Sequence, residues 1–338
     1  MILVLNCGSQ SIKWKVFDKK LNLLNQGKSE VLNLENFEEI LEKELLKITD
    51  EIDMIGHRVV HGGGIFTKPL EISDENLVEL EKINYLAPLH NPYNLLGIKV
   101  CHKIFKNVKQ IAVFDTEFFA NLPEIASTYA LPENIAKEFG FKRFGFHGIS
   151  HEYVSKKSKS KKMISVHLGG GASICAMKNG KVIDTSMGFT PMEGLVMMTR
   201  VGNIDAGIVF KLVREFGIEG ADKILNKESG IKGICGEDDM LKVLERMSVK
   251  GGSADEAERQ TAKFAFDIFI YSIKKYIGSY FAILGGCDAL IFTGSIGSGD
   301  PKTRNAVCKG LDILKKTKIL TIETDEELAI AEKLSKII

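Results

Sequence analysis

Apolar strands joined by small polar loops are the first pattern along the chain. Residues 2–5 form a continuous apolar run, which is typical of a strand buried on both faces. Ile12, Trp14 and Val16 then alternate with lysines, as in a strand with two distinct faces. Turn-forming residues at 6–11 join the two. The sequence therefore predicts a unit of strand, small polar loop and strand at its start.

The same pattern recurs later in the chain. The further predicted strands are residues 163–166, 174–177, 182–184 and 289–292. Gly-rich loops follow the first and the last of these, at 167–173 and 293–299. Asn179 and Gly180 predict a two-residue hairpin turn of the primed type.

Amphipathic helical patterns lie between the strands. The predicted helices are residues 36–48, 94–105, 256–283 and 325–337. Alternating strands and helices, together with a repeated strand–loop–strand unit, predict an α/β protein of two related halves.

Length and charge set limits on the class of protein. A chain of 338 residues is expected to form two domains. It has 45 Lys and Arg against 44 Asp and Glu, so charge gives no reason to expect binding to nucleic acid or to a membrane. No apolar run approaches the ~18 residues of a spanning helix, and the N-terminus lacks a basic leader, so we expect a cytoplasmic protein. The basic stretch 156–162 is interpreted as a solvated loop.

Six cysteines are spread along the chain without a CxxC pair or a His/Cys cluster at metal-ligand spacing. They are expected to be reduced and largely buried. A structural role is favoured for Cys7, which adjoins a candidate site.

Gly-rich loops directly after buried strands can present several backbone N–H groups to one anion. One such loop is weak evidence because glycine turns between strands are common, but three in one chain indicate a phosphate-rich ligand. The chain contains neither a GxxxxGK[ST] motif nor a GxGxxG that opens a helix after the first strand. A P-loop enzyme and a dinucleotide-binding fold are therefore both disfavoured.

The stretch 57–64, HRVVHGGG, carries a second signal. If it is a strand, Arg58 and Val60 share one face, while His57, Val59 and His61 share the other. A guanidinium beside a small apolar side chain suits a short carboxylic acid, with the carboxylate on the fork and the alkyl tail on the valine. An equal alternative is a surface arginine on an edge strand, with the glycines forming a turn.

Other polar residues favour the functional interpretation. Asp115 ends an apolar run, the usual place for a catalytic acid in an open sheet. His147 lies between glycines, with His151 four residues on, although a hydrogen-bonded core histidine is the alternative. Arg200 lies in a Gly-flanked polar loop. The set suits phosphoryl transfer to a small carboxylate.

Ten motifs in order then identify a family. They are NCGSQSIK, HRVVHGGGIF, LAPLHNPYN, VFDTEFF, RFGFHGISH, ISVHLGGGAS, DTSMGFTPMEG, TRVGNID, IFTGSIG and TDEELAIA, spanning residue 2 to about 331. The chain resembles the family of acetate, propionate and butyrate kinases, although it is shorter than a typical member, chiefly between Lys13 and His57. The resemblance implies reversible phosphoryl transfer between ATP and acetate, giving acetyl phosphate and ADP.

The resemblance also implies a fold and an assembly. Two duplicated ribonuclease-H-like domains, as in actin-like ATPases, would flank a central cleft. The first would comprise residues 1–119 and 327–338, with the last helix returning to it, and the second residues 120–326. The protein would be a homodimer.

The matched positions imply roles for individual residues. The expected catalytic residues are Asp115, His147 and Arg200, and the expected substrate-binding residues are Arg58, Val60, Leu89, His90, Phe146 and Pro191. The expected nucleotide-binding residues are Lys13, His167, Leu168, Gly169, Gly170, Gly171, Asp239, Met240, Leu241, Ser295, Ile296, Gly297, Ser298 and Gly299. Asn6 and Glu326 are expected to bind or support Mg²⁺, with Mn²⁺ as an alternative metal. Arg58, Arg200 and His147 are expected to meet around the acid and the transferred phosphorus.

Departures from the family motifs cluster at the nucleoside end. Gly170 replaces an asparagine, and residues 294–299 lack the acid and amide of the family loop. In the stretch Asp239-Met240-Leu241, Leu241 replaces the arginine that follows Asp-Met in the family. Phe119 replaces a histidine. Phosphoryl transfer to a carboxylate is therefore the firmer prediction, and the alternative is another donor, such as pyrophosphate or a different nucleotide.

Other activities of the same fold remain to be separated. Propionate or butyrate is an alternative acceptor, since one methylene changes discrimination only about 10–200-fold. A sugar kinase and a non-catalytic nucleotide sensor are the rival functions, but a sugar would not need an arginine beside a valine. A sensor has little use for cations that act where charge develops.

Overall fold

The computed structural model of the chain describes residues 1–9, 11–31, 35–248 and 253–337. The chain forms two compact units: unit 1 comprises Met1–Asn121, Phe146–Tyr153 and Asp325–Ile338, and unit 2 comprises Leu122–Gly145 and Val154–Thr324. The sequence analysis assigned residues 146–153 to the second domain, whereas here they belong to unit 1. The domain boundaries expected from the sequence stay a prediction.

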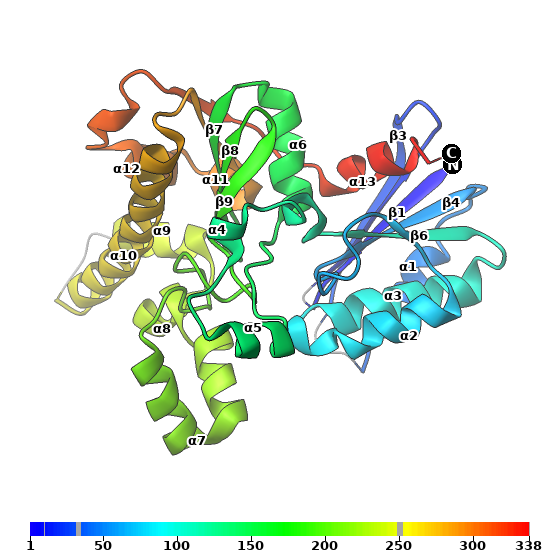
Figure 1. The fold of residues 1–338 in the computed structure, drawn as a ribbon, viewed down its shortest axis with the longest axis horizontal. Coiled ribbons are helices and arrows are strands. Elements are labelled where there is room, and N and C mark those ends of the chain that lie inside the picture. Colours follow the sequence, from blue (N-terminus) through cyan, green and yellow to red (C-terminus); the bar gives the residue numbers. More distant parts are fainter. Residues whose placement is uncertain (10, 32–34, 249–252, 338) are drawn as a thin grey trace. The chain divides into compact units, whose positions relative to one another are not determined.

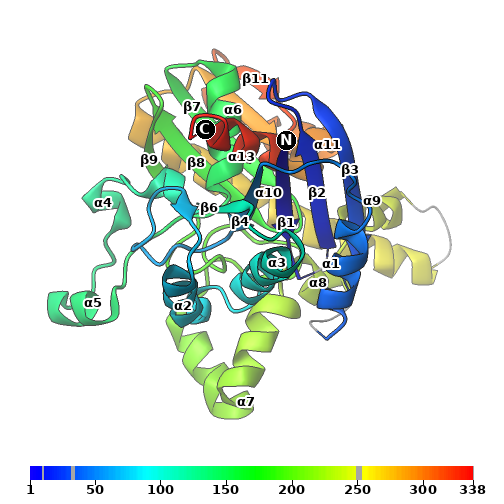
Figure 2. The ribbon, with the colours of Figure 1, turned by 90° about the vertical axis from the view of Figure 1, so that its right-hand side faces the viewer.

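Unit 1 is built on a six-stranded mixed sheet, in the order β3-β2-β1-β4-β6-β5 (Figures 1 and 2). Its strands are β1 (Ile2–Cys7), β2 (Ser11–Phe17), β3 (Leu23–Glu30), β4 (Met54–Val59), β5 (Leu70–Glu71) and β6 (Lys109–Phe114). β1, β4 and β6 are parallel to one another, and β2 and β3 are antiparallel extensions. The carboxyl ends of three strands therefore meet at one edge of the sheet.

Both faces of this sheet are covered. Its helices are α1 (Phe37–Leu45), α2 (Asp74–Lys82), η1 (Asn84–Leu86), α3 (Asn91–Ile104), η2 (Glu117–Phe119) and α13 (Glu326–Leu334). Figure 1 shows α13 on one face and α1, α2 and α3 on the other. Val4 packs in the same cluster as Ile330 of α13, whereas Leu3 packs with Leu41 of α1. The unbroken apolar run of β1 is explained by this double burial.

Unit 2 repeats the topology of unit 1. Its strands are β7 (Lys162–Leu168), β8 (Ala172–Lys178), β9 (Lys181–Thr185), β10 (Ala289–Thr293) and β11 (Lys318–Thr321). The order β11-β10-β7-β8-β9 corresponds to β6-β4-β1-β2-β3, with the same parallel and antiparallel pairings. Two related α/β halves, as the sequence predicted, are confirmed.

The helices of unit 2 differ from the sequence prediction at one point. They are α4 (Glu124–Ser127), α5 (Glu133–Phe139), α7 (Ala206–Lys227), α8 (Gly230–Cys235), α9 (Met240–Ser248), α10 (Ser253–Leu284), α11 (Gly294–Gly299), α12 (Pro301–Cys308) and η3 (Asp312–Leu314), while α6 (Gly148–Ser158) contributes to both units. The loop expected at 293–299 was wrong, because Gly294–Gly299 is the short helix α11. Arg304 Nη1 donates to the carbonyl oxygens of Gly297 and Ser298 at 3.0 and 2.7 Å, satisfying two acceptors at its end.

Other local predictions are confirmed. Asn179 and Gly180 have φ of 53° and 75°, as a primed hairpin turn requires. The cysteines are free thiols, and Cys7, Cys101 and Cys175 are buried. None of the described helices is long and apolar enough to cross a membrane.

Candidate active site

Three predicted polar residues converge at the carboxyl edge of the unit 1 sheet. Asn6 lies at the end of β1, Arg58 is the penultimate residue of β4, and Asp115 follows β6 directly. β4 lies between β1 and β6, so the alternative of a surface arginine on an edge strand is wrong. The strand ends at Val59, so the predicted alternation applies to Arg58 but does not extend to Val60.

The Arg58 guanidinium is surrounded by oxygen acceptors. Its Nη2 lies 2.6 Å from Asp115 Oδ2, and its Nε lies 3.2 and 3.3 Å from the two carboxylate oxygens. Its Nη1 lies 3.2 Å from Asn6 Oδ1 and 2.9 Å from Glu326 Oε2. The structure thus brings together four of the predicted site residues.

Burial and neighbouring charge oppose each other in this cluster. The pKa of Asp115 is raised to about 6, because burial, together with the Glu326 carboxylate, outweighs the lowering effect of the Arg58 guanidinium. Burial disfavours the charged form of Arg58, but the carboxylates of Asp115 and Glu326 outweigh it and raise its pKa. Arg58 is therefore a permanent cation held among acidic groups.

The N-terminus of α13 supplies two residues that the sequence analysis did not single out. Glu327 is buried, and its Oε1 accepts from Asn6 Nδ2 at 3.0 Å. Asp325 caps the helix by accepting from Leu328 N, and it pairs with Lys15 Nζ at 2.8 Å. Acidic side chains are favourable at a helix N-terminus, which explains why TDEE begins α13 here.

The oxygens at this edge fit a magnesium ion in chemical type. Among the described residues, no group of three or more His, Cys, Asp or Glu side chains could hold a metal by itself. Mg²⁺ commonly takes one or two protein carboxylates, with waters and substrate phosphates completing its shell. The Glu326 and Asp115 carboxylates and the Asn6 amide oxygen match that requirement.

His147 is adjacent to Asp115 through the backbone. Gly148 N donates to Asp115 O at 3.0 Å, and Asp115 also accepts from the backbone of Ile149. A Cβ at position 148 would lie 2.1 Å from Asp115 O, so only glycine allows this approach. His147 itself has a φ of 57° and is half-buried. His151 lies one turn further on and is fully buried, so the two histidines differ in exposure.

The segment after β4 is held by side chains instead of a strand partner. Val60 N donates to Asn94 Oδ1 at 3.0 Å, and His61 N donates to Asn91 Oδ1 at 3.0 Å. Asn91 Nδ2 returns a bond to His61 O at 3.1 Å, and Gly62 N donates to Thr116 Oγ1 at 3.1 Å. Asn91 and Asn94 were missed from the sequence, although two amides at i and i+3 in the motif HNPYN were a usable signal.

The expected acyl-binding side chains of unit 1 lie around this segment. Val60 is buried, and the Phe146 ring packs edge-on against His61 with centroids 5.2 Å apart. Leu89 and His90 are half-buried immediately before α3.

Lys13 lies directly opposite Asn6 in the β1–β2 pairing and is exposed. Directly opposite residues of an antiparallel pair share a face, so both belong to the face that α13 covers in part.

The Gly-rich loop of unit 2 packs against α11. A Cβ on Gly169 would lie 3.5 Å from Ser295 Oγ and 3.9 Å from His167 Nε2. Gly294 has a φ of 78°, and a Cβ there would lie 2.5 Å from Leu168 O. The expected nucleotide-binding residues of β7 and α11 therefore lie together. They are His167, Leu168, Gly169, Gly170, Gly171, Ser295, Ile296, Gly297, Ser298 and Gly299.

The loop of Arg200 adjoins the same region of unit 2. Met198 N donates to Gly170 O at 3.4 Å, and Met197 N donates to Arg200 O at 3.1 Å. Arg200 Nη1 donates to Pro191 O at 3.2 Å. Burial lowers the pKa of Arg200 to about 10, which still leaves it charged at neutral pH.

Asp239, Met240 and Leu241 belong to a different local structure. Asp239 Oδ1 accepts from Leu241 N at the start of α9, and α9 packs against α10. Met240 is buried in that packing, whereas Leu241 is 65% exposed. The nucleotide role of these three residues stays a prediction.

Known proteins resemble the whole chain. The sequence profile of the Acetokinase family matches residues 28–336. The acetate kinase of Dictyoglomus turgidum is 39% identical, over 100% of this chain and 97% of that protein. The chain belongs to the acetokinase family. The crystal structure of Porphyromonas gingivalis acetate kinase matches with a TM-score of 0.85 at 34% identity, covering 99% of both chains.

A propionate kinase is similarly close to this acetokinase. The crystal structure of a propionate kinase from Francisella tularensis matches with a TM-score of 0.85 at 35% identity, covering 98% of both chains. The family membership and the duplicated actin-like α/β fold expected from the motifs are confirmed.

Proposed function

We propose that the protein is an acetate kinase, which transfers a phosphoryl group reversibly between ATP and acetate. The observation that carries the proposal is the full-length similarity to acetate kinases, at 39% identity to one of them. The cluster of Arg58, Asp115, Asn6 and Glu326 supports it, because it provides a cation with a paired carboxylate at the edge of an open sheet.

In the proposed reaction a carboxylate oxygen of acetate forms a bond to the γ-phosphorus, and the bond from that phosphorus to the ADP oxygen breaks. Both reactants are anions, and charge spreads over the equatorial oxygens of the moving group. Arg58, Arg200 and His147 are proposed to offset this charge. Acetate is already ionised at neutral pH, so its attack needs no general base.

We infer that Asn6 and Glu326 help to hold Mg²⁺, or Mn²⁺ in its place, together with the nucleotide. The metal, when bound, offsets the charge of the nucleotide phosphates. Asp115 is proposed to orient Arg58 or a metal-bound water, since its carboxylate contacts the guanidinium that Glu326 also contacts. A variant Glu326→Gln is expected to weaken Mn²⁺ binding, which electron paramagnetic resonance of the free ion can measure.

ATP is the proposed donor, and pyrophosphate or another nucleotide is the alternative. The packing of the unit 2 loop beside α11 supports a phosphate-binding role, because Gly294 at the start of α11 approaches Leu168 O more closely than a residue with a Cβ could. A donor panel with purified protein tests the choice directly. Turnover with pyrophosphate and none with ATP would overturn the donor assignment but leave the acceptor assignment intact.

Acetate is the proposed acceptor, with propionate as the second candidate because of the similarity to a propionate kinase. Trapping of the acyl phosphate with hydroxylamine measures both. Phosphorylation of glucose instead of acetate would favour the rival sugar kinase, and nucleotide binding without any turnover would favour the rival sensor.

We propose that the protein forms a homodimer in the cytoplasm. Exposed apolar side chains on α7 support a self-association surface: Ile208, Phe210, Phe216 and Ile218 are 50–77% exposed. Sedimentation equilibrium of the protein and of Phe216→Asp tests it, and a wild-type monomer at micromolar concentration would contradict the proposal.

A further inference from the structure

A lysine-rich cavity lies in unit 2, at the opposite end of β7 from the Gly-rich loop. Its volume is about 480 Å³, within the range of roughly 300–1,000 Å³ common for small-molecule sites. The lining residues are Lys161, Lys162, Lys178, Asn179, Gly285, Gly286, Cys287 and Asp288. β7 begins at Lys162 beside this cavity and ends at Leu168, so the cavity is separate from the proposed nucleotide loop.

The sheet places like charges directly opposite one another here. Lys162 of β7 pairs with Lys178 of β8, and Lys178 pairs with Lys181 of β9. Like charges in directly opposite positions destabilise a sheet unless something offsets them. Neither Lys161 nor Lys178 forms a salt bridge within the part of the chain that the structure describes.

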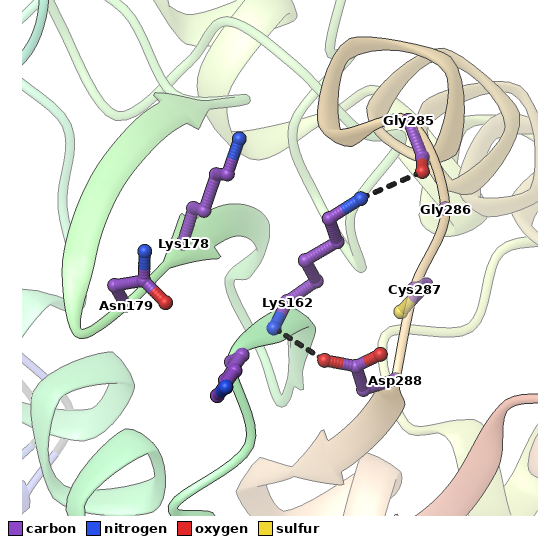
Figure 3. Close-up of a pocket in the computed structure, with 8 residues that line it drawn as sticks. Lys162, Lys178, Asn179, Gly285, Gly286, Cys287 and Asp288 are labelled. Carbon is purple, nitrogen blue, oxygen red and sulfur yellow. Dashed lines mark hydrogen bonds between the residues drawn. The ribbon is translucent and has the colours of Figure 1, made fainter.

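The walls of the cavity are held in place by hydrogen bonds between three segments (Figure 3). Lys162 N donates to Asp288 Oδ2 at 2.8 Å, and Lys162 Nζ donates to Gly285 O at 2.8 Å. Asn179 N donates to Lys161 O at 2.7 Å, which ties the hairpin turn to the start of β7. Figure 3 shows the side chains of Lys162 and Lys178 extending in the same direction.

The lining carries three lysines against one aspartate, a formal excess of two positive charges. We propose that this cavity binds a phosphate-bearing anion. Ammonium groups bind phosphate as point charges, and a dianion would match the excess and remove the repulsion across the three strands. The interpretation of the basic stretch 156–162 as a solvated loop was wrong at both ends, because residues 156–158 belong to α6 and Lys162 begins β7. The stretch would contribute Lys161 and Lys162 to a ligand site.

Thermal unfolding of the full-length protein tests the proposal, with inorganic phosphate as the probe and sodium chloride added to keep ionic strength constant. Lys178→Gln is expected to raise the phosphate concentration for half-maximal stabilisation about tenfold, corresponding to about 1.4 kcal/mol. The control Lys137→Gln removes the same charge from an exposed position on α5 and should leave that concentration unchanged. Phosphate binding at other sites affects both variants equally, so it does not contribute to the difference between them. Both variants should keep acetate kinase activity.

A second arm uses ADP, so that a nucleotide and free phosphate can be distinguished. A difference between wild type and Lys178→Gln in the concentration for half-maximal stabilisation supports the site in either arm. The arm with the larger difference shows whether the site prefers free phosphate or a nucleotide. The proposal would be overturned if wild type and Lys178→Gln are stabilised equally by phosphate and equally by ADP. It would also be overturned if Lys178→Gln and Lys137→Gln lose the same amount of that stabilisation. Without phosphate at low salt, Lys178→Gln should unfold at or above the wild-type temperature, and a clear decrease would contradict the repulsion on which the proposal rests.

Discussion

The Nη2 atom of Arg58 lies 2.6 Å from Oδ2 of Asp115, and the Arg58 Nε atom contacts the same carboxylate at 3.2 Å. The two residues come from neighbouring parallel strands, β4 and the end of β6, and are 57 positions apart in sequence. A planar guanidinium can make both contacts at once, whereas a lysine ammonium is a single flexible point charge. The pair therefore fixes the plane in which Arg58 can meet a substrate anion.

Arg58→Lys is expected to lower kcat by about a thousandfold while changing the KM for acetate much less, because the arginine acts mainly on charge that develops in the transition state. Steady-state kinetics of acyl phosphate formation measure both constants. Arg200→Ala should show the same pattern. Arg259→Lys, at a half-exposed ion pair on α10, is the matched control and should retain full activity. An equal loss in kcat and in acetate binding for Arg58→Lys would remove this role.

Asn94 is predicted to position the segment that carries Val60. Its side chain accepts from Val60 N and donates to Cys7 O, and both partners are buried. Asn94→Ala should cost about 3 kcal/mol of unfolding free energy, since it leaves two backbone groups unpaired. It should also raise the KM for acetate while leaving the KM for ATP unchanged.

Urea unfolding and kinetics of Asn94→Ala test the two effects together. Asn134→Ala, at an exposed position on α5, is the control and should change neither. A loss of stability without any change in the KM for acetate would mean that Asn94 is merely structural.

Local patterns explain which parts of this site could be predicted from sequence. Asp115 was found because an apolar run ends in a carboxylate, and the carboxyl ends of parallel strands meet at one edge. Arg58 was found because a guanidinium beside a small apolar side chain suits a short carboxylic acid, although the sequence left a surface arginine on an edge strand as an equal alternative. Asn91 and Asn94 were missed because their bonds reach His61 and Val60 across 30 and 34 positions, and the spacing of the two amides does not by itself reveal those partners.

The helix α11 shows the opposite failure. Gly294–Gly299 is rich in glycine and serine, which are poor helix formers, so the sequence favoured a loop. Packing decides otherwise: a Cβ on Gly294 would lie only 2.5 Å from Leu168 O, so the start of the helix approaches the end of β7 as closely as glycine permits. Tertiary contact has overridden propensity at the predicted phosphate-binding element.

Val60 is predicted to limit the length of the acyl chain. Val60→Ala should raise the ratio of kcat/KM for propionate over acetate by about tenfold, the value of one methylene in an apolar pocket. Val78→Ala, at a position 51% exposed on α2, is the control. An unchanged ratio in Val60→Ala would place the acyl chain elsewhere.

Two glycines of the proposed nucleotide site should respond in opposite ways: Gly170 in the loop after β7 and Gly294 at the start of α11. A Cβ on Gly170 would meet nothing within 4 Å, so Gly170→Asn, which restores the residue typical of the family, should fold normally. It is expected to raise kcat/KM for ATP relative to pyrophosphate. Gly294→Ala should lose stability and activity, because its φ of 78° is strained for alanine and the Cβ would clash with Leu168 O. A normal Gly294→Ala protein would contradict this account of the loop.

His57 is predicted to make the protein less stable in mild acid. It is buried beside Gln110, and burial lowers its pKa from 6.5 to about 4 despite the bond to Gln110. The unfolded chain therefore binds a proton near pH 6.5 that the folded protein refuses, so this contribution to stability is full above pH 6.5 and is lost as pH falls towards 4. Between pH 7 and 5 the loss should be about 2 kcal/mol. Urea unfolding at pH 7 and pH 5 measures this loss of unfolding free energy, which should be smaller by that amount in His57→Gln than in wild type. The control His102→Gln, at an exposed site on α3, should lose as much unfolding free energy as wild type. Equal losses in wild type and His57→Gln would mean that His57 takes up its proton in the folded state as readily as in the unfolded chain.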